Sequence, residues 1–282
     1  MESLKPFPLL MKFIIERSAK LFPKQEIVDR DFMYTYHDAY ERMCKLANVL
    51  QDLGVQTGDK VATLAWNTHR HFELYWSVPC MGAVLHPINV RLFPDQITHI
   101  ISHAEDKVVF LDDDLIPLVE NLKNELKTVE TYAIMSDKAN VPKTILEPSY
   151  EYESLLRRAP SRFEWPEFDE NTLATLNYTT GTTGEPKGAC FTHRMLFLHT
   201  LITTLPEAFR ITRYDTVLHI VPMFHAHSWG LPYDSTLVGA KQVFPGRFEI
   251  EAMMELILRE KVTVTGAVPT VYAMMLELPE AD

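Results

Sequence analysis

One stretch of the chain combines residue types that bind phosphate. Residues 174–192 read Ala-Thr-Leu-Asn-Tyr-Thr-Thr-Gly-Thr-Thr-Gly-Glu-Pro-Lys-Gly-Ala-Cys-Phe-Thr. The glycines permit positive φ and close backbone approach, the threonines offer hydroxyl and N–H groups to phosphate oxygens, and the lysine adds a positive charge. We predict a phosphate-binding loop made by Thr179, Thr180, Gly181, Thr182, Thr183, Gly184, Lys187 and Gly188. The alternative is a polar surface turn without a ligand.

This loop differs from the Walker A phosphate loop, which needs G-x-x-x-x-G-K-[ST] followed directly by a helix. Counted from Gly181, the sixth position holds Pro186. Lys187 is followed by Gly188 and by a strand-like Ala-Cys-Phe-Thr. We therefore expect a loop that joins two strands, and a phosphotransferase of the Walker A type is disfavoured.

Three histidines form a second group that could do chemistry. His219, His225 and His227 lie in or just before residues 222–230, which read Pro-Met-Phe-His-Ala-His-Ser-Trp-Gly. In a strand, an H-x-H pair puts two imidazoles on one face, which could bind zinc. No cysteine or acid nearby completes the three protein ligands that catalytic zinc normally has. A buried core histidine at position 225 is a second alternative.

Four segments resemble one known family. Residues 178–188 look like the signature of the adenylate-forming (AMP-binding) superfamily, which includes acyl- and aryl-CoA ligases, luciferases and peptide-synthetase adenylation domains. Residues 222–230, 237–243 and 266–270 are most similar to medium- and long-chain fatty acyl-CoA synthetases. The resemblance extends over nearly the whole chain.

The resemblance implies an ATP-dependent ligase that uses Mg²⁺ and coenzyme A. A fatty acid and ATP would give acyl-adenylate and pyrophosphate, and the acyl group would then pass to coenzyme A. An aryl-CoA ligase of the same superfamily is an alternative. By resemblance, the catalytic residues are Lys187 and His225, the metal-binding hydroxyl is that of Thr179, and Arg247 faces coenzyme A. The residues implied to line the acid site are His225, Trp229, Gly230, Gly266, Val268 and Pro269.

The acid site lacks the charge that an amino acid substrate would need. A buried ammonium group must be paired with a carboxylate, because an unpaired buried charge is strongly unfavourable. Residues 222–230 contain no acid, and Asp234 lies in an apolar, helix-like run where a structural or entrance role is expected. An apolar acid therefore fits the segment better than an amino acid.

Composition narrows the class of protein. The chain has 282 residues, 46% of them hydrophobic, and a formal net charge of −11, which argues against a nucleic-acid surface. Cys44, Cys80 and Cys190 stand singly, so we expect reduced, buried thiols in a cytoplasmic protein. The N-terminus lacks the pattern of a signal peptide, and no apolar stretch approaches the ~20 residues of a membrane span. We expect no stable membrane insertion.

The positioning elements alternate between strands and helices. This alternation predicts an α/β fold with mostly parallel, buried strands. Expected strands are 27–28, 33–36, 60–65, 84–87, 108–111, 173–177, 217–221, 241–244 and 262–266. Expected helices are 7–21, 37–53, 69–81, 95–103, one from 115, one from 193 to about 209, 249–260 and one from 270. Asp112, Asp113 and Asp114 are expected to cap the helix at 115 rather than to bind metal. Residues 136–170 are expected to be a long excursion.

The resemblance also implies how much of the enzyme is present. In the family, the large domain holds two packed α/β subdomains, so residues 1–282 would be its N-terminal portion, with the second subdomain incomplete. The chain stops before the family's aromatic-Gly-x-Thr-Glu motif, its ribose-binding Asp and its late catalytic Lys. We therefore expect little activity from this chain alone, and an exposed apolar edge that favours a homodimer. The alternative is a nucleotide-binding or scaffold fragment without catalysis.

Overall fold

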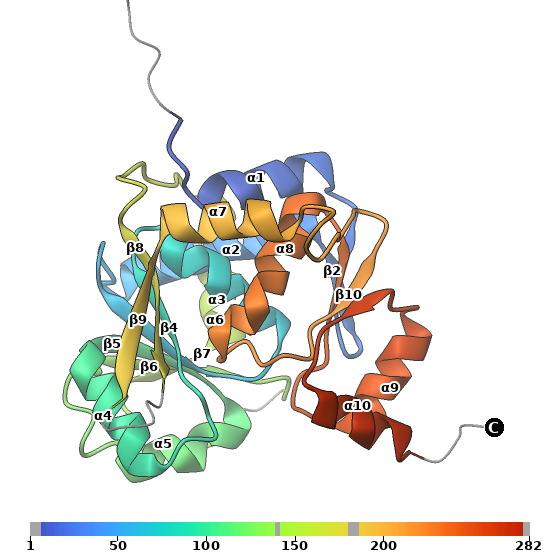
Figure 1. Cartoon of the computed structure of the whole chain (residues 1–282). Coiled ribbons are helices and arrows are strands. Elements are labelled where there is room, and N and C mark those ends of the chain that lie inside the picture. The colour runs from blue at the N-terminus through green and yellow to red at the C-terminus, as the bar shows by residue number, and fades with distance from the viewer. Residues whose placement is uncertain (1–6, 139–141, 180–185, 279–282) are drawn as a thin grey trace, which may run out of the picture.

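Two β-sheets form the framework of the protein (Figure 1). The computed structural model describes residues 7–138, 142–179 and 186–278. The five-stranded sheet has the order β12 (Val264–Thr265), β10 (Thr216–Leu218), β11 (Lys241–Phe244), β1 (Glu26–Asp29) and β2 (Phe32–Thr35). The seven-stranded sheet has the order β7 (Ser149–Glu151), β6 (Thr131–Met135), β5 (Asp106–Asp112), β3 (Lys60–Leu64), β4 (Val84–Pro87), β8 (Leu173–Thr179) and β9 (Lys187–Thr192).

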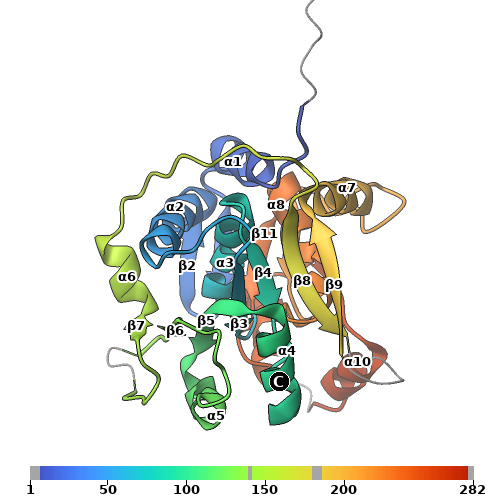
Figure 2. The same ribbon diagram turned by 90° about the vertical axis from the view of Figure 1, so that its left-hand side faces the viewer.

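Neighbouring strands run parallel except in the hairpins β1–β2 and β8–β9. The helices lie around and between the sheets (Figure 2). They are α1 (Lys12–Leu21), α2 (Tyr36–Asp52), α3 (His69–Cys80), α4 (Pro94–Ala104), α5 (Ile116–Leu122), α6 (Tyr152–Arg158), α7 (His193–Thr203), α8 (Leu231–Val238), α9 (Ile250–Arg259) and α10 (Pro269–Leu276). Two short 3₁₀ segments are η1 (Asp113–Leu115) and η2 (Ala226–Gly230). Mostly parallel strands alternating with helices confirm the predicted α/β fold.

The seven-stranded sheet is covered on both faces, as the apolar runs of its strands require. Along β5, Val108 and Phe110 pack into one hydrophobic cluster with α1, α2, α3 and α6. Val109 and Leu111 face the other way, into a cluster with α4 and α5. Successive strand residues point to opposite faces, so one apolar run fills two cores.

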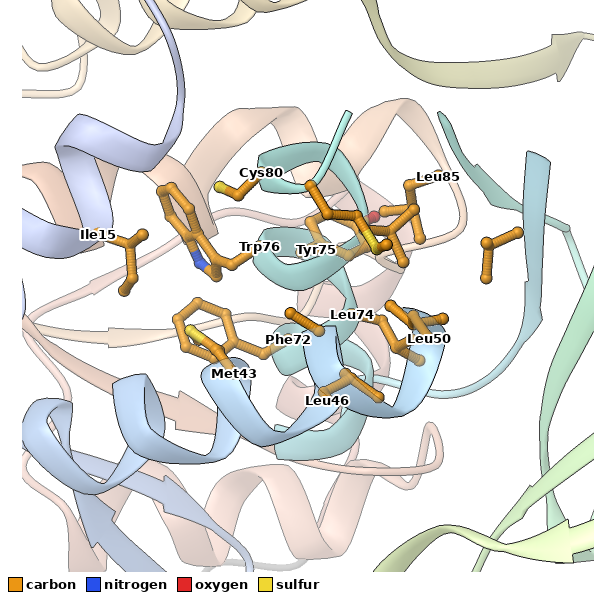
Figure 3. Packing of buried hydrophobic residues seen from close by; sticks show 14 of the residues in the cluster. Ile15, Met43, Leu46, Leu50, Phe72, Leu74, Tyr75, Trp76, Cys80 and Leu85 are labelled. Carbon is orange, nitrogen blue, oxygen red and sulfur yellow. The ribbon is translucent and has the colours of Figure 1, made fainter. Parts of the chain in front are cut away.

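Helix α3 is the centre of the core, because every one of its residues is buried. Thr68 begins the helix by accepting a hydrogen bond from the His71 N–H through its side chain. Figure 3 shows Phe72 and Trp76 of α3 packed beside Met43 and other residues of α2. The centroid of the Trp76 ring also lies 5.2 Å from that of Tyr233 of α8. The helix thereby connects the outer helices to the elements that carry the second sequence motif.

Four expectations about the elements need correction. The segment 136–170 is less irregular than expected, because it contains β7 and α6, and β6 just before it was also not predicted. Helix α1 begins only at Lys12, and α7 already ends at Thr203. The prolines and charges of residues 136–170 obscured β7 and α6 in the sequence, whereas pairing with β5 makes β6 a strand and pairing with β6 makes β7 one.

The expected cap at residues 112–114 is wrong. Asp112 precedes η1 without any side-chain capping hydrogen bond. Its carboxylate instead accepts a hydrogen bond of 2.7 Å from the Trp66 N–H, and Asp114 accepts one from the Trp66 indole. Asp113 accepts one from the Ser136 hydroxyl. Trp66 follows β3 and Ser136 follows β6, and these two strands are the neighbours of β5. The three carboxylates therefore bond to these donors in place of the helix N–H groups.

Two of the three cysteines are buried as expected, and one is not. All three are free thiols, with Cys44 and Cys80 buried, whereas Cys190 is exposed. Cys190 lies on β9, an edge strand whose outer side is not covered by another strand. None of the helices in the described part of the chain is long and apolar enough to cross a membrane.

Candidate active site

The β8–β9 hairpin carries the predicted phosphate loop. Its last cross-strand pairs are Tyr178 with Gly188 and Thr179 with Lys187. Thr179 and Lys187 are exposed and face each other at the mouth of the loop. This pairing confirms that the loop joins two strands. The remaining predicted loop residues, Thr180, Gly181, Thr182, Thr183 and Gly184, lie outside the described residues.

Gly188 lies against side chains of β8, with little room for a side chain of its own. A Cβ at this position would lie 3.0 Å from Leu176 Cδ1 and 3.4 Å from Tyr178 Cζ. The first contact is tighter than most Cβ contacts, so a larger residue would require the Leu176 side chain to shift by a few tenths of an ångström.

Side chains hold the end of the hairpin on its inner side. Strand β8 pairs with β4 only at Thr175, where it faces Leu85. Beyond that pair, the Tyr178 hydroxyl is hydrogen-bonded to His103 Nδ1 of α4 at 2.5 Å. The Asn177 side-chain amide donates a hydrogen bond to the ring of His227, 2.9 Å from Nε2. The second contact joins the phosphate hairpin to the second sequence motif.

The second motif adopts an unusual backbone. Four consecutive residues, Ala226, His227, Ser228 and Trp229, have positive φ between 45° and 56°. For residues with a Cβ this left-handed conformation costs about 1–2 kcal/mol each. The Ser228 hydroxyl donates a hydrogen bond of 2.7 Å to the Val221 carbonyl, and Asn177 holds His227. These contacts fix a turn that the local sequence would not favour.

This turn forms one wall of a cavity of about 520 Å³. Most of its lining is apolar, and its polar groups are two imidazoles, a tyrosine hydroxyl and the indole N–H of Trp229. The lining residues are Phe191, Met195, Leu196, His199, Phe209, Ala226, His227, Trp229, Gly230 and Tyr233. The size and lining are typical of a small-molecule site. Two of the residues that the resemblance implied for the acid site, Trp229 and Gly230, line this cavity.

The histidines of the motif lie in different places. His225 is exposed and is not among the lining residues, so the alternative of a buried core histidine is wrong. His227 lines the cavity, whereas the sequence suggested only a disfavoured zinc ligand at this position. His219 is buried, and its Nε2 is hydrogen-bonded to Gln242 Oε1 at 2.9 Å. An H-x-H pair shares a face only in a strand, and the left-handed turn separates 225 from 227.

Burial keeps the inner histidines neutral. Desolvation, together with the nearby His199 and His71, lowers the pKa of His227 to about 3. Desolvation also lowers the pKa of His219 to about 3 and that of His199 below its usual value. In residues 7–138, 142–179 and 186–278, no group of three or more His, Cys, Asp or Glu side chains is arranged to hold a metal. A zinc site at these histidines is therefore not supported.

The segment 266–270 contributes one residue near the cavity, Gly266. A Cβ at Gly266 would lie 3.2 Å from Trp229 Cζ3, so this glycine makes room for the indole. Val268 and Pro269 are exposed at the beginning of α10 and do not line the cavity. The predicted set of acid-site residues is thus only partly brought together.

Arg247 lies at a separate, polar cleft of about 220 Å³. Its guanidinium is 5.6 Å from the Trp66 ring and 3.5 Å from Asp114 Oδ2. Most of the other lining residues follow the carboxyl ends of β1, β3, β5, β6 and β11, where open α/β sheets place ligands. The two cavities share no lining residue.

Asp234 lies beside the apolar cavity but does not line it. Its side chain is fully buried between α7 and α8. One carboxyl oxygen accepts a hydrogen bond of 2.7 Å from the Thr203 hydroxyl, and Oδ2 has no partner among the described residues. Desolvation raises its pKa to about 8. The carboxyl is therefore protonated at neutral pH, and it could not hold a substrate ammonium group as a buried anion.

A family model for AMP-binding enzymes matches residues 15–282. The chain belongs to this family. The chain is 44% identical to a long-chain-fatty-acid–CoA ligase of Thermus thermophilus over 273 residues, which are 95% of the chain and 49% of the relative. It is 36% identical to a medium-chain-fatty-acid–CoA ligase of Ectopseudomonas oleovorans, covering 95% of the chain and 50% of the relative.

A solved structure has the same fold as this member of the AMP-binding family. The inhibitor-bound N-terminal domain of FACL13 from Mycobacterium tuberculosis superposes with a TM-score of 0.85 at 25% identity, covering 96% of the chain and 65% of that domain. The chain spans about half the length of the curated relatives it matches.

Proposed function

We propose that this chain is the N-terminal part of the large domain of an AMP-forming fatty acid–CoA ligase. In the proposed reaction, a fatty acid and ATP give acyl-adenylate and pyrophosphate, and the acyl group then passes to coenzyme A. The family membership and the names of the relatives support an acyl-CoA ligase. The prediction of cytoplasmic location continues to rest on the free cysteines.

One observation carries the proposal: the apolar cavity adjoins the phosphate hairpin. His227 lines the cavity and is also bonded to Asn177 of β8, just before the loop begins. An apolar acid in the cavity would therefore have its carboxylate directed toward phosphates held between Thr179 and Lys187. Such alignment of two reactants supplies a large part of the catalysis of group transfer.

The first step needs charge neutralisation rather than a base. A carboxylate is already ionised at neutral pH, and one of its oxygens would attack the α-phosphorus of ATP while the bond to pyrophosphate breaks. The exposed Lys187 ammonium would balance the charge of the departing pyrophosphate. His225, exposed on the loop before η2, is proposed to contact the nucleotide side of the same site.

The donor set fits a magnesium ion held mainly by phosphates. Mg²⁺ usually keeps several waters and takes few protein oxygens when it binds nucleotides. The exposed Thr179 hydroxyl at the end of β8 offers one such oxygen. When bound, the ion would neutralise phosphate charge, and this chain's part would be to place Thr179 and Lys187 on either side of the phosphates.

Coenzyme A is proposed to approach from the polar cleft. The exposed Arg247 guanidinium could pair with a nucleotide phosphate there.

The apolar surface near the C-terminal end of the described chain includes Leu276, which is 86% exposed, and Val268, which is 50% exposed. This surface would also suit the proposed homodimer.

Calorimetric titration of the chain with decanoate, benzoate and Mg²⁺–ATP tests this proposal. We expect decanoate to bind more tightly than benzoate, and ATP binding to be independent of Trp229. The variant Trp229→Ala should weaken decanoate binding and leave ATP binding unchanged, whereas Lys187→Ala should do the reverse. Binding of neither acid would contradict the acyl pocket, and tighter binding of benzoate would favour the aryl-CoA ligase.

A further inference from the structure

His199 is the polar group that stands out in the apolar cavity. It belongs to α7, and its neighbours in the lining include Met195, Phe209 and Trp229. The other lining imidazole, His227, is already bonded to Asn177. The Tyr233 hydroxyl is sealed from solvent, without a partner among the described residues. His199 is exposed, and among the residues that the structure describes its ring nitrogens have no hydrogen-bond partner. The indole N–H of Trp229 also has none there, but an indole can only donate, whereas a neutral imidazole can both donate and accept.

The wall of the cavity is shaped around the His199 ring. A Cβ at Gly230 would lie 2.6 Å from His199 Cε1 and 2.9 Å from Nδ1. Any side chain at position 230 would therefore displace the imidazole, and the φ of +82° there favours glycine as well. The absence of a side chain at Gly230 leaves room for the His199 ring in the wall of the cavity.

The chemistry of this ring is that of a neutral donor and acceptor. Partial desolvation lowers the pKa of His199, so the imidazole is uncharged at neutral pH. A neutral imidazole has one N–H donor and one acceptor nitrogen. A purely aliphatic chain would cover these atoms without replacing their bonds to water, which is unfavourable. A hydroxyl group can both donate to and accept from such a ring.

We propose that His199 is a specificity-determining residue that favours acids carrying a hydroxyl group on the acyl chain, at the level of Gly230. This inference rests on the proposed function, because it takes the cavity to be the acyl pocket. The occupant is a hydroxylated aliphatic acid, and the preference is a matter of binding with no covalent step.

The test compares decanoate with its positional hydroxy isomers, each titrated into the 282-residue chain by calorimetry at neutral pH. We expect the ratio of hydroxy-acid affinity to decanoate affinity to peak when the hydroxyl is on one chain carbon, or on one of two adjacent chain carbons. His199→Leu should reduce that preference about threefold to tenfold, which is the effect of losing one ordinary hydrogen bond. His199→Gln, which keeps a donor and an acceptor, should restore most of it.

Met195→Leu is the matched control, because Met195 lies on the same helix and lines the same cavity. It should change the affinity for all the acids together and leave the preference unaltered. An equal preference in wild type and His199→Leu at every position would overturn the inference and leave the proposed function standing. Failure of decanoate and all hydroxy acids to bind would overturn the acyl pocket and this inference together.

Discussion

Replacing Asp234 by Asn should make the stability of the protein less sensitive to pH. The carboxyl of Asp234 is fully buried, and desolvation raises its pKa from 3.8 to about 8. Between these values the folded state keeps a proton that the unfolded state has lost. The free energy of unfolding therefore falls as pH rises through this window, because the folded state binds more protons.

The magnitude follows from that single proton. Each pH unit in the window costs wild type about 1.4 kcal/mol of stability, or about 4 kcal/mol between pH 4.5 and 7.5. Asn has no proton to lose, and its carbonyl can still accept the hydrogen bond from Thr203. Near pH 4.5 the variant should be equal to wild type or slightly less stable, because its new N–H donors need partners. Near pH 7.5 it should be the more stable protein.

Urea unfolding of both proteins at pH 4.5, 5.5, 6.5 and 7.5 measures this difference directly. Asp95→Asn, at an exposed position on α4, is the matched control and should keep a constant offset from wild type. A stability difference between Asp234→Asn and wild type that does not change with pH would refute the reasoning. It would mean that Asp234 ionises in the folded state at its ordinary pKa.

Three further substitutions test the candidate site. Lys187→Ala should weaken ATP binding at least tenfold with unchanged thermal unfolding, since a charge-assisted hydrogen bond contributes about 1.5–3 kcal/mol; equal affinity by titration would remove Lys187 from the site. Trp229→Ala should shift the preferred chain length in a series of fatty acids, since one methylene in an apolar pocket is worth about 1–3 kcal/mol, and an unaltered profile would make the indole a packing residue. Tyr178→Phe removes the hydrogen bond to His103 and should lower both ATP affinity and stability by about 1 kcal/mol. The last expectation fails if only stability changes, because the hydroxyl would then have no part in placing the loop.

Short sequence patterns were sufficient to predict most strands and helices and the β8–β9 hairpin. Alternating apolar runs and helix caps act over a few residues, so strands such as β3 and β4 and helices such as α2 follow from the sequence. The strand-like runs on either side of the loop likewise predict that it joins two strands, and the pairing of Thr179 with Lys187 confirms it. These features depend on neighbours in the chain.

Long-range packing decided which side chains reach the cavity. His225 and His227 differ little as sequence positions, but a left-handed turn held by Ser228 and Asn177 buries one and exposes the other. Helices α7 and α8 enclose Asp234 and make it neutral. The neighbouring residues in the chain signal neither the burial of His227 nor the neutral state of Asp234. Desolvation and hydrogen bonding depend on what segments distant in the chain bring to a residue, and only the folded protein brings those segments together.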